Sequence, residues 1–126
     1  MGPKGYYNTK GVVVMTVYVI RETYDDHEQW AEDSCAYTDV LCNEGGFENQ
    51  DEAMARSKEL ANAKIEEFTS DYQRDVACYE DIGEDSEGIL APQLEMVKPR
   101  EGDLGGWDAY YDDHEYEYRV VPIEIH

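Results

Sequence analysis

Hydrophobic and polar residues alternate most regularly in two stretches, one near each end of the chain. The first stretch, Gly11 to Glu28, starts as an apolar run and continues as alternating β-branched, aromatic and polar residues. The second stretch, Tyr116 to Ile125, alternates in the same way. A period of two residues with such side chains is typical of strands, so both stretches predict long β-strands. Pro122 predicts an edge position or a bulge in the second strand.

The same acidic pentapeptide stands at one end of each predicted strand. Tyr24-Asp25-Asp26-His27-Glu28 closes the first strand, and Tyr111-Asp112-Asp113-His114-Glu115 precedes the second. In an antiparallel pair, the end of one strand lies beside the start of the other. If the first and last strands pair in this way, the two pentapeptides meet at one end of a sheet.

A helix is predicted to begin after Asn49. Asn49 is a favourable N-cap, and Glu52, three residues later, can complete a capping box. Apolar residues near helical spacing then form one stripe, which extends through Val76 and Tyr79 in one helix or two. The first members of the stripe are Met54, Leu60, Ala61, Ile65, Phe68 and Tyr72.

Shorter patterns complete the expected fold. Cys35 to Asn43 predicts a second strand and Leu94 to Val97 a short edge strand, whereas Arg100 to Asp108, with three glycines, predicts a loop. This order predicts an α+β fold, in which one main helix packs on one face of a small, mostly antiparallel sheet of three to four strands. The length of 126 residues predicts a single domain, with residues 1–10 as a loose leader.

The charge balance limits the classes of partner. The chain has 30 acidic and 10 basic residues, which gives a formal net charge of −20. Such a charge excludes nucleic acid and anionic membranes as simple electrostatic partners, and it favours basic proteins, cations or high salt. At the charge density of duplex DNA, twenty charges span about 34 Å.

The cysteines and the chain ends predict a cytoplasmic protein. Cys35, Cys42 and Cys78 are odd in number and do not resemble a disulfide framework, although a Cys35–Cys42 bridge stays open. No apolar stretch has the length of a membrane span, and the first residues lack the apolar core of a signal peptide. Met15 stays open as an alternative start.

The sequence shows no catalytic signature. It has no nucleophile elbow, no P-loop and no glycine-rich dinucleotide motif. A non-enzymatic protein without a cofactor is therefore predicted. The pentapeptides could instead hold a cation through their carboxylates, with His27 and His114 as additional ligands. Their spacing matches no calcium-binding loop, so two solvated acidic turns are the simpler interpretation.

Acidic clusters and aromatic residues together suggest a surface that contacts a partner protein. Trp107 and Tyr110 are candidate aromatic anchors, although packing within the protein is the simpler explanation for them. The candidate contact residues are Asp25, Asp26, Glu28, Asp112, Asp113 and Glu115, with Asp81, Glu84 and Asp85 as a second group.

Three acidic clusters, Glu22–Asp33, Asp75–Glu87 and Glu101–Glu117, carry a resemblance to a known class. In size, acidity and absence of catalytic motifs, the chain resembles the small phage-encoded inhibitors that imitate nucleic acid, including anti-restriction and anti-CRISPR proteins. The resemblance implies a protein that occupies the basic nucleic-acid groove of a partner in the host cytoplasm. Those inhibitors share no single fold, so the resemblance implies nothing about the fold. An accessory or salt-adapted acidic domain and a metal-binding protein are the alternatives.

Overall fold

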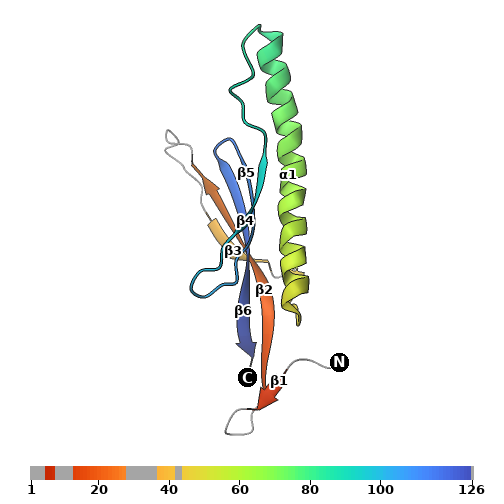
Figure 1. The fold of residues 1–126 in the computed structure, drawn as a ribbon, viewed down its shortest axis with the longest axis vertical. Helices are drawn as coiled ribbons and strands as arrows, with labels where there is room; N and C mark the ends of the chain where they lie inside the picture. Colours follow the sequence, from red (N-terminus) through yellow and green to blue (C-terminus); the bar gives the residue numbers. More distant parts are fainter. Residues whose placement is uncertain (1–4, 8–12, 28–36, 42–43, 126) are drawn as a thin grey trace.

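The protein, seen in a computed structural model that describes residues 5–7, 13–27, 37–41 and 44–125, is a sheet with one long helix along one face (Figure 1). The predicted α+β class, the antiparallel sheet and the single main helix are confirmed. Within the described residues the sheet has six strands, more than the three to four expected. The elements in chain order are β1 (Gly5–Tyr7), β2 (Val13–Asp26), β3 (Tyr37–Val40), α1 (Gln50–Asp81), β4 (Gln93–Val97), β5 (Gly106–Tyr111) and β6 (His114–Ile125).

The strands follow the order β1-β2-β6-β5-β4, and β3 pairs with β2 on the edge that β1 also uses. All pairs are antiparallel. The longest pair joins β2 to β6, from Met15 opposite Ile125 to Asp26 opposite His114. Beyond it, the His27 backbone N–H donates a 2.7 Å hydrogen bond to the Asp113 carbonyl. The prediction that the two pentapeptides meet at one end of the sheet is therefore confirmed.

Two strands lie where the sequence predicted none. β1 falls within the expected leader, and it pairs through only three residues of β2. β5 begins at Gly106, inside the expected loop, and it lies between β4 and β6. Its glycine, its aspartate and its short length hide the pattern of a strand, and pairing on both sides supplies the stability that local preference does not. β6 is a central strand, but past Arg119 only β2 flanks it in the register, so Pro122 has the open side that it requires.

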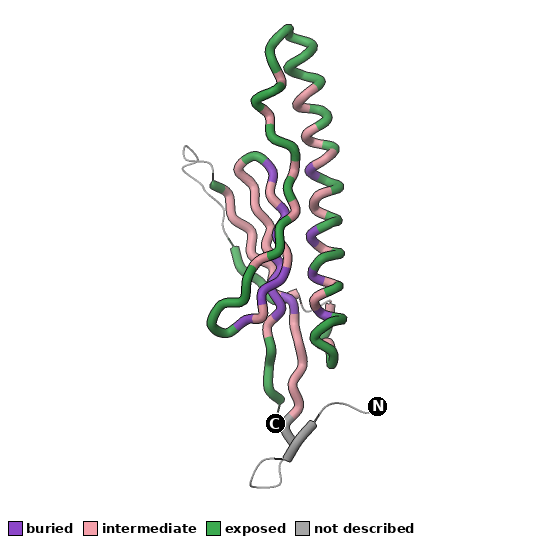
Figure 2. Tube along the Cα trace, in the orientation of Figure 1, coloured by how far each residue is buried: buried purple, intermediate pink, exposed green. Residues whose placement is uncertain are grey.

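α1 is one continuous helix of 32 residues, which corresponds to about 48 Å. Its start is as predicted, because the Asn49 side chain accepts hydrogen bonds from the backbone N–H groups of Asp51 at 2.7 Å and Glu52 at 3.3 Å. The helix buries Ala53, Ser57, Ala61 and Phe68 against the sheet, whereas its C-terminal end extends beyond β5 and β6 and is mostly exposed (Figure 2). No basic residue lies in its last turn, so nothing there offsets the negative end of the helix dipole.

The core lies between α1 and the middle of the sheet. Its buried members include Ile20, Phe68, Ala109 and Tyr118, and Figure 2 shows that the buried residues concentrate there. Both α1 and β6 approach β5 closely at Gly106, where an added Cβ would overlap the Tyr118 carbonyl oxygen and lie 2.9 Å from Ser57 Oγ. The Ser57 hydroxyl donates a 2.7 Å hydrogen bond to the same carbonyl, which ties α1 to β6.

Candidate functional site

Strand alternation places neighbouring residues of the pentapeptides on opposite faces of the sheet. Tyr116 and Tyr118 of β6 pack with the core under α1. Because neighbouring residues of a strand point to opposite faces, Glu115 lies on the other side, and so does its partner Asp25. We call this second side, which carries Asp25, Asp108, Glu115 and Glu117, the open face.

Three side chains of the pentapeptides converge on the open face. The His27 Nε2 atom lies 3.2 Å from Glu115 Oε1 and 3.7 Å from Asp25 Oδ2. Asp25 and Glu115 lie opposite each other in the register of β2 and β6, and His27 follows at the end of β2. The hydrogen bond to Glu115 raises the pKa of His27 against the opposing effect of burial, and the charges of Asp25, Glu115 and Asp113 add to it. One potential ligand atom from each residue lies within 4.8 Å of the others.

Asp108 of β5 adds a fourth group beside this cluster. It lies opposite Glu117 in the β5–β6 register, two pairs away from the pair that contains Glu115, and is only 6% exposed. Burial raises its pKa to about 8, and the hydrogen bond to Glu115 and the charges of Glu115, Glu117 and Glu95 act in the same direction. Its Oδ1 atom has no hydrogen-bond partner among the described residues.

The centre of the open face is neutralised by buried ion pairs. Arg119 Nη1 donates to Asp103 Oδ1 at 2.9 Å and to the Lys98 carbonyl at 3.0 Å. The connection from β4 to β5, which contains Asp103, therefore covers this part of the sheet on the side away from α1 (Figure 1). Arg119 and Arg100 also pair with Glu117. These arginines are committed to Asp103 and Glu117, so Asp108 faces carboxylates without a cation of its own.

On the face toward α1, the pentapeptides contribute aromatic side chains rather than carboxylates. Tyr24 hydrogen-bonds His114 Nδ1 at 2.8 Å, and its ring lies 4.7 Å from that of Tyr116. His114 is therefore held in an aromatic cluster, on the opposite face from His27. The two histidines that were candidate ligands of one cation do not converge, because the period of two residues separates them.

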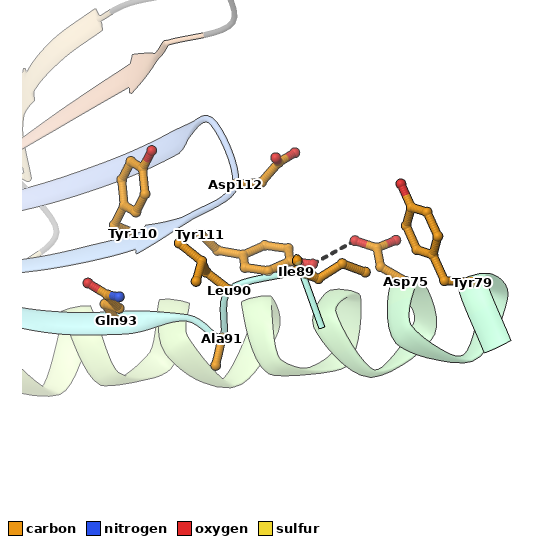
Figure 3. A pocket seen from close by; sticks show the side chains of 10 residues that line it. Asp75, Tyr79, Ile89, Leu90, Ala91, Gln93, Tyr110, Tyr111 and Asp112 are labelled. Atoms are coloured by element: carbon orange, nitrogen blue, oxygen red, sulfur yellow. Dashed lines mark hydrogen bonds between the residues drawn. The ribbon is translucent and has the colours of Figure 1, made fainter. Parts of the chain in front are cut away.

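A pocket of about 520 Å³ connects the β5–β6 turn with the C-terminal half of α1. Figure 3 shows the side chains that line it, with the Tyr111 hydroxyl directed at Asp75, to which it donates a 2.7 Å hydrogen bond. Burial and this hydrogen bond raise the pKa of Tyr111. Asp112 and Tyr79 also line the pocket. The pocket therefore places carboxylates of α1 and of the β5–β6 turn side by side.

The remaining predicted contact residues separate into different places. Asp81, Glu84 and Asp85 are exposed at and beyond the end of α1, and Asp112 and Asp113 form the β5–β6 turn. Tyr110 lies on the open face, where its ring centroid is 6.3 Å from that of His27. Trp107 does not join it, because Trp107 packs on the helix side under Lys58 Nζ at 4.6 Å. Its role as a partner anchor is therefore not supported. Glu28 lies outside the described residues.

The sequence alone does not distinguish Asp108 or Glu117 as functional residues. Asp108 falls in the predicted loop and Glu117 in the predicted last strand, and nothing local distinguishes them from the other acidic residues. A signal exists only in the register, since Asp108, Glu115 and Glu117 share one face once β5 pairs with β6.

Comparison with known proteins adds no assignment, since neither a protein-family model nor a curated protein nor a solved structure matches the chain. No helix in the described part of the chain is both long and apolar enough to cross a membrane.

Proposed function

We propose that this protein binds the basic nucleic-acid groove of a partner protein and blocks it, without catalysing a reaction. The observation that carries the proposal is the meeting of three acidic segments at one end of the molecule. Residues 22–27, 75–97 and 101–118 contain no Lys or Arg. We call the place where they meet the acidic end; its carboxylates are Asp25, Asp26, Asp75, Asp81, Glu84, Asp85, Asp112, Asp113 and Glu115.

Contacts between these segments hold the acidic end together. The Asp113 carbonyl accepts the His27 N–H, which joins the end of β2 to the β5–β6 turn. The Tyr111–Asp75 hydrogen bond joins that turn to α1. Asp81, Glu84 and Asp85 follow at the exposed end of the helix (Figure 1). The fold therefore holds the three segments that carry these carboxylates together, and such preorganisation favours competition with a stiff polyanion.

The sizes are compatible with this interpretation. α1 is about 48 Å long, and the net charge of −20 corresponds to about 34 Å of duplex DNA. A protein with this excess of negative charge attracts Arg- and Lys-lined grooves over long distances, and the attraction depends steeply on salt. A cytoplasmic location, in a host cell if the gene is carried by a phage, fits such a partner.

The test begins with proteins of the host lysate that are retained on heparin and captured by the full-length chain. Affinity for a captured partner should fall steeply with salt, and DNA or RNA should displace the protein. A variant with Asp81→Asn, Glu84→Gln, Asp85→Asn and Asp112→Asn should bind at least about 10-fold more weakly.

A matched control removes the same number of charges elsewhere, with Glu52→Gln, Glu59→Gln, Glu66→Gln and Glu124→Gln. It should retain affinity within about threefold. The proposal is wrong if nucleic acid does not compete or if both variants lose the same affinity. Folding that requires molar salt would instead support a salt-adapted acidic domain.

A further inference from the structure

We infer that the open face binds one divalent first-row transition-metal ion at the end where β2, β5 and β6 meet. Its ligands are Asp25, His27, Asp108 and Glu115. This inference is independent of the proposed partner, since it concerns the packing and chemistry of four side chains on one face.

The three pentapeptide residues of this site lie close enough together to bind one ion. Their potential ligand atoms lie within 4.8 Å of one another. Ligand atoms at about 2.1 Å from a shared ion are separated by at most about 4.2 Å. The pair His27 Nε2 and Glu115 Oε1, at 3.2 Å, already satisfies this limit, and small side-chain rotations bring Asp25 within it.

Asp108 provides independent support for a cation at this place. This side chain is 94% shielded from solvent, given its exposure of 6%, yet its Oδ1 atom lacks a hydrogen-bond partner among the described residues. A buried acceptor without a donor costs free energy, and few native proteins retain one without a reason. Asp108 contacts Glu115, a member of the cluster, and its other close charges are the carboxylates of Glu117 and Glu95. A cation between Asp108 and Glu115 would satisfy the unpartnered oxygen and remove the repulsion.

The type of ligand selects the type of ion. Carboxylate oxygens suit Mn²⁺, Mg²⁺ and Ca²⁺, whereas an imidazole nitrogen favours transition metals. Manganese satisfies both preferences. The side chains of Asp25 and His27 are 46% and 44% exposed, so water molecules can complete the coordination from the solvent side.

The backbone holds these ligands in place before any ion binds. Asp25 and Glu115 are in direct register, and the His27 N–H is fixed by the Asp113 carbonyl. Asp108 lies two residues before Tyr110, the partner of Glu115 on β5. A site on paired strands loses less conformational entropy on binding than one on a loop. Solvent-exposed carboxylates scattered along α1 have no such arrangement.

The experiment titrates the full-length chain with Mn²⁺ alone and counts free ions by electron paramagnetic resonance. One ion should bind per chain, with a Kd below about 100 µM. Glu115→Gln and His27→Ala should each weaken binding at least about 10-fold, and Asp108→Asn at least about threefold. Glu124→Gln, an exposed acid at the other end of β6, is the control and should leave the Kd unchanged.

Circular dichroism in EDTA checks that each variant folds. We expect all of them to fold, because two of the substitutions reduce repulsion between carboxylates and His27→Ala removes a partly exposed ring. Selective broadening of the amide resonances around Tyr110 and Thr23 by Mn²⁺ would locate the ion on the open face. Equal affinity in all variants overturns the inference, and so does the absence of binding at 1 mM Mn²⁺. Unchanged affinity in Asp108→Asn alone removes Asp108 from the site and overturns the assignment of four ligands.

Discussion

Buried Asp108 of β5 and Glu115 of β6 lie near each other on the open face, two register pairs apart, and the charge of Glu115 helps to raise the pKa of Asp108. A carboxyl group that is buried beside other carboxylates keeps its proton to higher pH, because its charged form loses hydration and is repelled by its neighbours. The arrangement follows from strand register, because Asp108 lies opposite Glu117 and on the same face as Glu115. Burial and the neighbouring carboxylates thus favour the protonated form of Asp108.

The proton on Asp108 predicts an unusual dependence of stability on pH. Its pKa is about 8 in the folded protein and near 3.8 in the unfolded chain, so between these values the folded state binds the extra proton. The free energy of unfolding should therefore decrease as the pH rises from about 4 to 8, with a slope approaching about 1.4 kcal/mol per pH unit. Chemical denaturation in EDTA at several pH values measures this slope.

The control for this measurement is Asp108→Asn, which should flatten the slope. His27 also has a raised pKa, so its contribution is lost in the same direction above pH 6.5, and the variant retains it. A wild-type slope that persists in Asp108→Asn would show that another group carries the proton.

The buried pair between Arg119 and Asp103 should be essential for stability. The two side chains are 6% and 2% exposed, and Asp103 also accepts the backbone N–H groups of Gly105 and Arg100. Burial opposes ionisation of Asp103, but these hydrogen bonds and Arg119 outweigh it and lower its pKa. Asp103→Asn removes the more deeply buried of the two carboxylates that pair with Arg119, and should reduce the free energy of unfolding by about 3–5 kcal/mol.

Asp71→Asn is the matched control, since Asp71 pairs with Arg74 at 3.2 Å on the exposed surface of α1. It should change the free energy of unfolding by less than about 1 kcal/mol. Similar losses in both variants, measured by urea denaturation, would contradict the importance of the buried pair.

The close approach of α1 to β5 and β6 predicts a strict requirement for glycine at position 106. A Cβ there would overlap the Tyr118 carbonyl oxygen of β6 and lie 2.9 Å from Ser57 Oγ of α1. Gly106→Ala should therefore destabilise the protein by about 3 kcal/mol or more, because backbone atoms must move. Thermal denaturation of Gly106→Ala and of Gly88→Ala, whose Cβ would contact nothing within 4 Å, separates this effect from a general loss of glycine. An unchanged melting temperature in Gly106→Ala would refute the close packing.

Local patterns were sufficient to predict the main elements. The alternation around Val17 and Val121 predicted β2 and β6, and Asn49 with the apolar stripe predicted α1. The repeated pentapeptide predicted which strand ends meet, because antiparallel pairing brings the end of one strand to the start of another. The strands and the helix depend on interactions between residues a few positions apart. The meeting of the pentapeptides depends on antiparallel pairing, which allows only one arrangement of the strand ends.

The sequence by itself therefore determined the class of fold, the long helix and the meeting of the two acidic pentapeptides. Only the tertiary structure decided that β5 is a strand, that Trp107 packs under α1, and that His27 and His114 separate onto opposite faces. It also decided that Asp108 is buried near Glu115. The physical reason is that burial and the pairing of carboxylates depend on which strands become neighbours, and this choice is made by packing across the whole chain.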